Sequence, residues 1–285
     1  MKDWRVCRVS NTRRKLGKLV TASAKKQPLN KAFLADVMSA IEVLDRKGRR
    51  MPSRTYKPSS MVCMRQMYYQ VTGENPDESS TDYASVGMAD TGTRRHVAIQ
   101  EAVSAMAELG YEWKYLDVEE YLRGKWAQGK CLDVQVVGKR GVETALRHKT
   151  LNISFMCDGI VRHIPSGEDF LFEFKNQISF KYGHDDKDPG AVAKSHVDSQ
   201  HEDQVCTYCM ALDLNQALVL YENRDNCNLE CPEVYEVTDE MKQARVDKIL
   251  ECDSYVERQV PPPMHSDSKP CRWCQYKTAC KKHGR

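Results

Sequence analysis

The sequence contains no run of about eighteen apolar residues, which is what a membrane-crossing helix requires. Of its 285 residues, 29% are charged, and the mean hydropathy is −0.63. The basic start of the chain also lacks the apolar stretch of a secretory signal. These absences predict a cytoplasmic protein with no membrane partner.

Acidic residues are scarce at the start of the chain. Residues 1–60 hold sixteen Lys and Arg against four Asp and Glu, a balance of +12, so residues 61–285 carry −9 of the total +3. A basic segment joined to an acidic body suggests a polyanionic partner such as DNA. A solvated tail and an organellar transit peptide are the alternatives.

The first 58 residues are predicted to form a region separate from the rest of the chain. We expect a basic arm and an amphipathic helix over residues 30–46, followed by a larger domain over residues 59–285. The connector after the helix is basic, and three of its arginines are expected to follow DNA phosphates: Arg49, Arg50 and Arg54.

Hydrophobic periodicity predicts helices and strands in the larger region. Helices are expected over residues 61–73, 90–109, 193–212 and 238–258. Strands are expected within residues 115–138 and over residues 142–146, 151–179 and 217–222. The segment 151–179 is the centre of this pattern because its charged residues suggest a chemical site.

Residues 151–179 are predicted to form two strands joined by a turn at Pro165–Glu168. Glu173 and Lys175 are two residues apart and therefore share one face of the second strand. Asp158 on the first strand would pair with one of them. Two carboxylates and an amine on adjacent strands could form a compact site for a divalent cation. A surface hairpin with a cross-strand ion pair is the alternative.

Two helices offer further polar side chains. His96 lies on the apolar stripe of the helix over residues 90–109, so its imidazole is expected to face inward, as a ligand or as a satisfied core histidine. Gln204 and Tyr208 share one face of the helix over residues 193–212. An ordinary solvated stripe is the alternative for that face.

Twelve cysteines without a secretion signal favour metal ligation over disulfides. Cys271, Cys274 and Cys280 have the spacing C-x2-C-x5-C, whose larger gap suits an iron–sulfur cluster better than a single ion. A zinc knuckle and a disulfide pair are the alternatives. Cys63, in the short helix over residues 61–73, is the best candidate for a fourth ligand. The competing donors are Cys206, Cys209, Cys227, Cys231 and His283.

Taken in chain order, these motifs resemble the iron–sulfur branch of the RecB-like nucleases in the PD-(D/E)xK superfamily. That branch includes CRISPR-associated exonucleases of the four-cysteine type, the AddB nuclease domain and related phage exonucleases. The resemblance covers residues 59–282, whereas the first 58 residues match nothing in the pattern. The motifs are Cys63, Gly92-x3-His96, Asp158, Glu173-x-Lys175, Gln204-x3-Tyr208 and the three terminal cysteines.

The resemblance implies an α/β fold with a restriction-endonuclease-like core, which means a mixed central sheet flanked by helices. A helical N-terminal region and a C-terminal iron–sulfur loop would close against each other. It implies metal ligation by His96, Asp158 and Glu173, with Lys175 orienting or deprotonating the attacking water. Gln204 and Tyr208 would line the DNA path, and a [4Fe-4S] cluster would be held by Cys63, Cys271, Cys274 and Cys280.

The function expected from these residues is a metal-dependent exonuclease that acts on single-stranded DNA ends. Carboxylates with one imidazole suit Mg²⁺ or Mn²⁺. The resemblance implies DNA repair, recombination, phage replication or CRISPR processing in a prokaryotic or phage-infected cell. A second copy of the chain or a recombination or CRISPR protein is the expected protein partner. The alternatives are a non-catalytic DNA-binding accessory protein with a structural iron–sulfur or zinc site, and an iron–sulfur redox protein.

Overall fold

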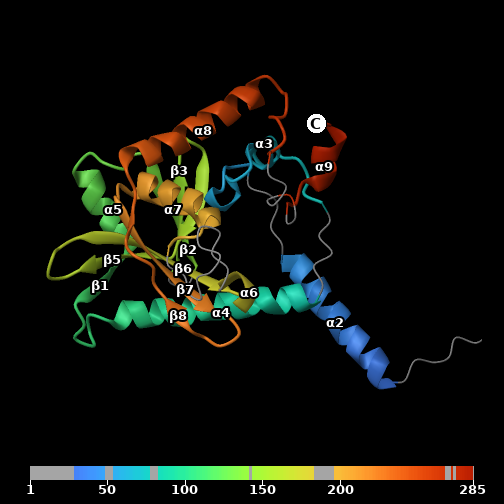
Figure 1. The fold of residues 1–285 in the computed structure, drawn as a ribbon, viewed down its shortest axis with the longest axis horizontal. Helices are drawn as coiled ribbons and strands as arrows, with labels where there is room; N and C mark the ends of the chain where they lie inside the picture. Colours follow the sequence, from blue (N-terminus) through green and yellow to red (C-terminus); the bar gives the residue numbers. More distant parts are fainter. Residues whose placement is uncertain are drawn as a thin grey trace, which may run out of the picture. The chain divides into compact units, whose positions relative to one another are not determined.

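A computed structural model describes residues 29–48, 54–77, 83–140, 143–182, 196–266, 271 and 274–284 (Figure 1). These residues belong to two compact units. The smaller unit includes helix α2 (Leu29–Gly48) and residues 83–87. The predicted helix over residues 30–46 is confirmed as α2. The larger unit holds the remaining described residues, including α4 from Met88 onward, and the elements discussed below are described within it.

The central sheet of the larger unit is mixed. β5 lies between β1 and β6 and is antiparallel to both, whereas β7 runs parallel to β6. A parallel pair needs a long crossover, and here the crossover includes helices α6 (Ser179–Tyr182) and α7 (Ser199–Leu212). The predicted α/β class is therefore confirmed. The strands are β1 (Trp113–Leu116), β5 (Gly159–His163), β6 (Asp169–Gln177), β7 (Gln216–Asn223), β8 (Leu229–Glu230) and β9 (Tyr235–Glu236).

Helices cover both faces of this sheet (Figure 1). On one face, Ile99 of α4 (Tyr83–Ala105) packs with Phe172 and Phe174 of β6. On the other, Val205 of α7 packs in a cluster that includes Leu171, and α8 (Asp239–Glu257) packs against α7. Because β6 is covered on both faces, both sets of its alternating side chains are buried.

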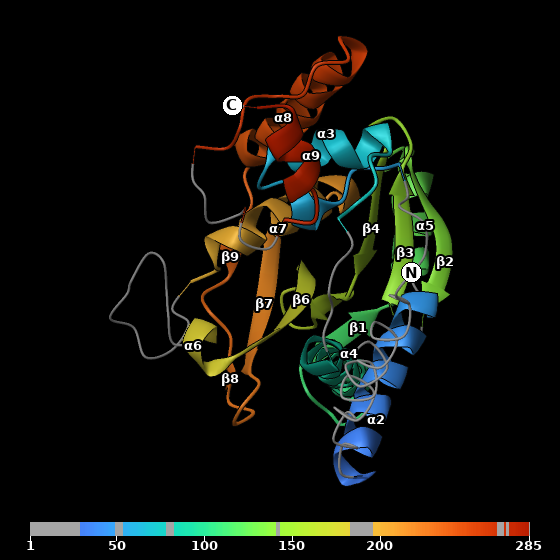
Figure 2. The same cartoon turned by 90° about the vertical axis from the view of Figure 1, so that its right-hand side faces the viewer.

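A second, antiparallel sheet lies beside the first, as Figure 2 shows. Its strands are β2 (Val134–Arg140), β3 (Glu143–His148) and β4 (Ile153–Cys157). The first strand of the predicted hairpin is therefore divided: β4 pairs with β3, and the chain passes through Asp158 into the central sheet as β5. The hairpin itself is confirmed for β5 and β6, whose turn is closed by a 2.8 Å hydrogen bond from Gly167 N to His163 O.

Strands are expected within residues 115–138, and β1 and β2 supply them at the two ends, but residues 118–127 between them form helix α5 (Val118–Ala127). The side chain of Asp117 caps this helix by accepting a hydrogen bond from Glu120 N at 3.0 Å. Val118 and Leu122, four residues apart, are buried on its inner face. The Asp117 cap and the four-residue spacing of Val118 and Leu122 favour a helix here, and they outweigh the strand propensity of the flanking residues.

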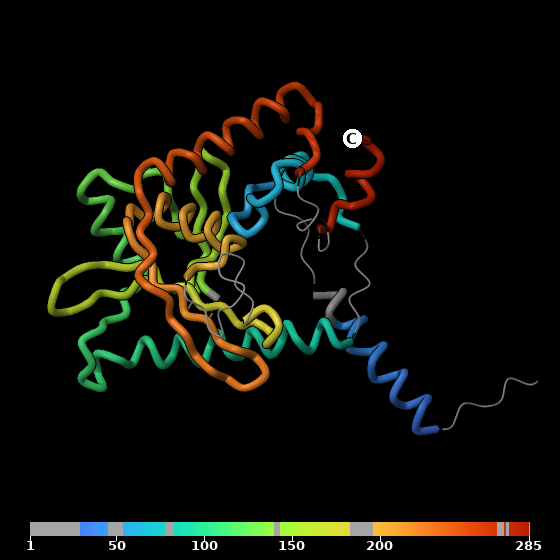
Figure 3. Tube along the Cα trace, viewed as in Figure 1, coloured from blue at the N-terminus to red at the C-terminus, as the bar shows by residue number. Residues whose placement is uncertain are grey.

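The C-terminal tail folds back onto the start of the larger unit (Figure 3). Tyr69, on α3 (Met64–Thr72), contacts the rings of Tyr276 and His283, with centroids 5.8 Å away in both cases. The remaining short helices here are η1 (Pro58–Ser60) and α9 (Lys277–Lys282). None of the helices in the described ranges combines the length and apolar character needed to cross a membrane.

The residue after Asp158 is a glycine for a steric reason that can be tested. A Cβ at Gly159 would lie 2.3 Å from Cε2 of Tyr115, a residue of the neighbouring strand β1. We therefore expect Gly159→Ala to lower the free energy of unfolding by about 1–3 kcal/mol, as overpacking generally does. Urea unfolding followed by circular dichroism measures this change.

The matched control is Gly124→Ala on α5, where a Cβ meets no atom within 4 Å. This variant should be as stable as the parent or up to about 1 kcal/mol more stable, because alanine favours helix. A Gly159→Ala protein with the parent's stability would show that the close approach of Tyr115 places no constraint on the chain there.

Candidate functional site

A cleft of about 460 Å³ runs along α4 and faces the start of β3 and the end of β6. Polar side chains from four separate elements line it. They are His96 of α4, Glu143 of β3, Lys175 and Asn176 of β6, and Arg224 just after β7. Gly92, one turn before His96, also lines the cleft, and a Cβ there would meet no atom within 4 Å.

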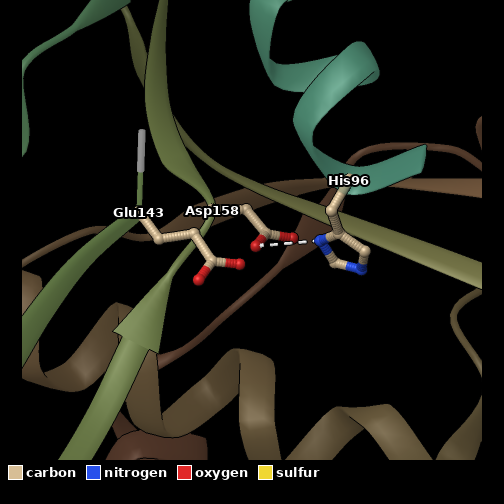
Figure 4. A group of neighbouring side chains, drawn as sticks. All are labelled: His96, Glu143 and Asp158. Atoms are coloured by element: carbon tan, nitrogen blue, oxygen red, sulfur yellow. Dashed lines mark ion pairs between the residues drawn. The ribbon is translucent and has the colours of Figure 1, made fainter. Parts of the chain in front are cut away.

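Three side chains form a possible metal site at this cleft (Figure 4). His96, Glu143 and Asp158 each offer one ligand atom, and these atoms all lie within 4.8 Å of one another. Nδ1 of His96 is 3.4 Å from Oδ1 of Asp158. One imidazole with two carboxylates is a donor set that suits Mn²⁺ and Mg²⁺.

Asp158 is held in place by the neighbouring strand and helix. Its Oδ2 accepts a 2.7 Å hydrogen bond from the backbone N–H of Phe174, and its carbonyl accepts one from Gln100 Nε2 at 3.1 Å. The ring of Phe174 also contacts the His96 imidazole edge-to-face at 4.9 Å. Burial disfavours the charged imidazole, but the carboxylates of Asp158 and Glu173 raise the pKa of His96 above its ordinary value.

A second polar network lies immediately behind the cleft. The ammonium of Lys175 donates to Oε1 of Glu173 at 2.7 Å and to Oε1 of Gln204 at 2.9 Å. Gln204 Nε2 in turn donates to Glu173 Oε1 at 2.7 Å and to the hydroxyl of Tyr208 at 2.9 Å. Burial raises the pKa of Glu173, the charge of Asp158 raises it further, and Lys175 opposes both effects. The network fixes the ammonium at the wall of the cleft.

Glu143 belongs to the tight cluster, although the sequence prediction assigned metal ligation to His96, Asp158 and Glu173. Glu173 lies in the adjacent network and is 2% exposed. Thr144 of β3 pairs with Cys157 of β4 in antiparallel register. Glu143 precedes Thr144 and Asp158 follows Cys157, so this register brings Glu143 opposite Asp158. No motif in the sequence links these two strands, so only their register reveals the contact.

Gln204 and Tyr208 are buried, with exposed fractions of 9% and 4%. The resemblance implies that they line a DNA path, whereas here Gln204 contacts Glu173 and Lys175 from the side of α7, and Tyr208 contacts Gln204. The ring of Tyr208 stacks on Phe155 at 4.9 Å. Arg54 is exposed and does not line the cleft, while Arg49 and Arg50 lie outside the described residues.

The four cysteines of the predicted cluster meet at one place. Cys63, Cys271, Cys274 and Cys280 all line a cavity of about 160 Å³ between the start of α3 and the C-terminal tail. Cys63 is buried, and the other three are half-buried. Burial raises the pKa of the Cys63 and Cys274 thiols, and the charges of the neighbouring thiolates raise both further. The structure therefore brings together residues more than 200 positions apart.

The competing cysteine donors lie elsewhere. Cys206 and Cys209 are buried within α7, and Cys227 and Cys231 are exposed near β8. His283 Nδ1 lies 2.9 Å from the carbonyl of Ala279, in the last turn of α9, and does not line the cavity. Among the described residues, Cys63 is thus the cysteine that joins the three of the tail.

Arg65 ties the tail to α3. The side chain is only 5% exposed, and its Nε donates to the carbonyl of Pro262 at 2.7 Å. Its Nη1 lies 3.2 Å from the carbonyl and 3.4 Å from Sγ of Cys280, and 2.9 Å from the carbonyl of Gly284. The guanidinium thereby brings a positive charge to the cysteine cavity, which it also lines.

No family model and no curated protein matches the chain. Among solved structures, 18 chains match, including one titled "Crystal structure of SSO0001". That structure is 13% identical in sequence, with a TM-score of 0.44, over 90% of this chain and 98% of the other. A likeness of this degree assigns no role to any residue, so the site must be argued from its own geometry.

Removal of the Arg65 guanidinium should release the tail. Arg65→Met keeps the length of the side chain but leaves the buried carbonyl of Pro262 and those of the tail without their donor. Each unmet buried acceptor costs about 1–3 kcal/mol. We expect faster amide hydrogen exchange in α9 and a lower free energy of unfolding.

The control is Arg258→Met at the end of α8, where the arginine is exposed and its contacts, to Ser254 and to the ring of Tyr255, lie within its own helix turn. Its α9 amides should exchange at the parent's rate. Parent-like exchange in Arg65→Met would mean that the tail is held by its other contacts.

Proposed function

We propose that this protein is a metal-dependent deoxyribonuclease that hydrolyses phosphodiester bonds at the cleft along α4. The observation that carries the proposal is the convergence of His96, Glu143 and Asp158 on one point, with the ammonium of Lys175 in the wall of the same open cleft. A buried structural site would not need a cleft of this size. A binding protein would not need a lysine held by two polar partners beside clustered carboxylates.

The arrangement of elements supports a restriction-endonuclease-like core of the PD-(D/E)xK type. The aspartate stands immediately before β5, the antiparallel strand β6 carries the Glu-x-Lys pair, and a helix covers each face of the sheet. A crossover through α7 then leads to β7, which is parallel to β6. This order of elements brings the predicted catalytic residues, Asp158, Glu173 and Lys175, to one edge of the core.

The residues fit a divalent metal ion. Glu173 Oε2 is buried and has no hydrogen-bond partner among the described residues, and His96 Nδ1 has only its 3.4 Å contact to Asp158 Oδ1, so both could serve as ligands beside Asp158 and Glu143. A bound cation would polarise the scissile phosphodiester and lower the pKa of a water. Asp158 would stay in position because the Phe174 N–H holds its second oxygen.

Lys175 would act on the attacking water. Two of its three N–H donors are engaged by Glu173 and Gln204, which leaves one for a water or a phosphate oxygen in the cleft. The ammonium would orient the nucleophile and stabilise charge on the phosphorus oxygens in the transition state, whereas deprotonation of the water would require the neutral amine. Hydrolysis would leave a 5′-phosphate and a 3′-hydroxyl.

We also propose that the cysteine cavity holds a [4Fe-4S] cluster. Four thiols around about 160 Å³ supply the four ligands that such a cluster needs. A single zinc ion would bind the same four sulfurs at about 2.3 Å and is the alternative occupant. Arg65, with a 3.4 Å contact to Cys280 Sγ, would offset the charge of the thiolates. The cluster would be structural and would fasten the tail to α3.

DNA with single-stranded ends is the proposed substrate, since the basic balance of residues 1–60 suits a polyanion. Residues 59–285 would form the nuclease domain. The setting we propose is the cytoplasm of a prokaryotic or phage-infected cell, in repair, recombination or CRISPR processing, with the protein partners expected from the resemblance.

The first test is cleavage of 5′- and 3′-end-labelled DNA, single-stranded and duplex, with Mg²⁺ or Mn²⁺. We expect the wild type to release label only with metal, and Asp158→Ala, Glu143→Gln and Lys175→Ala to be slower by about 10²–10³-fold. Asp158→Ala and Lys175→Ala should still bind DNA. The label lost first gives the polarity of digestion.

The matched control is Glu119→Gln, which changes the same group on the exposed surface of α5, where Glu119 pairs with Arg123. It should cleave at the wild-type rate. Wild-type protein that binds DNA and carries its cluster without cleaving any substrate would instead be the accessory protein. Full activity in Glu143→Gln would remove this residue from the metal site.

The cluster is tested by Cys274→Ala. We expect this variant to be colourless and poorly soluble, with little iron and acid-labile sulfide, because a lost ligand exposes the tail. Cys227→Ala, a change at an exposed cysteine away from the cavity, should stay brown. A soluble brown Cys274→Ala protein would contradict the ligand set, and zinc in place of iron in the wild type would favour the zinc alternative.

A further inference from the structure

Arg224 lies in the cleft but has no part in the proposed metal site. Its guanidinium is fixed on one side only. Nε donates to Oδ1 of Asn176 at 2.6 Å, and Nη2 donates to the carbonyl of the same residue at 3.2 Å. Asn176 follows Lys175 directly on β6, so Arg224 is attached one residue away from the proposed catalytic lysine.

The side chain of Asn176 is itself held by buried charges. Its Nδ2 donates to Oε1 of Glu222 at 2.7 Å, on the neighbouring strand and in register with Asn176. Glu222 is fully buried and forms a two-pronged ion pair with Arg95 of α4, with Nε at 2.9 and 3.0 Å from its two oxygens. The carboxylate must accept, so the amide turns its oxygen to Arg224.

The positive charge of Arg224 is left uncompensated by this network. Arg95 already neutralises Glu222, and no carboxylate in the described ranges forms an ion pair with Arg224. The adjacent Asp225 interacts with the charge of Arg224 but forms no ion pair with it, and its Oδ2 accepts a 3.0 Å hydrogen bond from Ser179 N. Of the five N–H donors of an arginine, the two bonds to Asn176 leave three for a ligand.

We propose that Arg224 binds a phosphate of the DNA strand, next to the bond that is cleaved, and that Asn176 is the positioning residue that aims it. The planar fork of an arginine matches two oxygens of one phosphate, and a guanidinium fixed in advance loses little freedom on binding. This inference rests on the proposed nuclease function. It adds a substrate contact that neither the metal site nor the Glu-x-Lys pair supplies.

The test measures binding without cleavage, in chelator, with a single-stranded oligonucleotide over a range of salt concentrations. Arg224→Gln should bind about tenfold more weakly, and the slope of log K against log salt should shrink by about 0.7, the share of one phosphate contact on a single strand. The matched control is Arg123→Gln on α5, an arginine that is 69% exposed and should bind as the wild type does.

A second arm identifies the phosphate. A series of oligonucleotides each carries one neutral methylphosphonate, at successive positions along the strand. The wild type should bind an oligonucleotide more weakly when the substituted phosphate is one that makes a charge contact. At one position next to the scissile bond, the losses from the methylphosphonate and from Arg224→Gln should not add, because both remove the same contact. Additive losses at every position, or an unchanged salt slope, would overturn the inference.

Two further variants separate contact from folding. Arg224→Lys keeps the charge without the fork, and Asn176→Leu keeps Arg224 without its support, so both should bind severalfold more weakly with the wild-type salt slope. Wild-type affinity in Asn176→Leu would refute the positioning role. A wild type that cleaves DNA but shows additive losses defeats this inference alone, whereas one that neither binds nor cleaves DNA defeats the proposed function.

Discussion

The hydrogen bond from the Phe174 N–H to the Asp158 carboxylate is the constraint on which the site depends. Asp158 lies at the crossing point where the chain passes from the sheet of β2, β3 and β4 to the central sheet. The 2.7 Å hydrogen bond holds this crossing point against β6. Because Asp158 is only 5% exposed, a shift would leave a buried carboxylate and a buried N–H unpaired. The crossing point in turn determines where Glu143 and His96 meet it.

Strand β6 has two different buried faces. Phe172 and Phe174 pack against α4, and this apolar contact fixes the position of the helix that carries His96 to the cleft. Glu173 and Lys175 face α7, where Gln204 forms a hydrogen bond with each of them. A buried charged pair is tolerated only with such partners, so the network that makes β6 stable also holds the ammonium still. Fold stability and preorganisation of the site have the same source here.

The C-terminal tail follows another principle. It buries few apolar side chains, Tyr276 and Ala279 among them, and therefore depends on polar contacts with α3. Arg65 and Tyr69 reach the tail from adjacent turns of that helix, and Cys63 stands just before its first turn. In the proposed function, a metal cluster completes this attachment, because small polar surfaces alone contribute little stability.

The sequence by itself determined most of the local elements, with α5 as an exception, and the identity of most site residues. Alternation predicted the shared face of Glu173 and Lys175, helical spacing predicted the inward His96, and cysteine spacing predicted a common site for Cys271, Cys274 and Cys280. Only the tertiary structure decided the partners that come from distant strands. Glu143 reaches Asp158 through the register of β3 on β4, and Arg224 reaches Asn176 through the pairing of β7 with β6. Such registers depend on packing across the whole sheet, which no local pattern encodes.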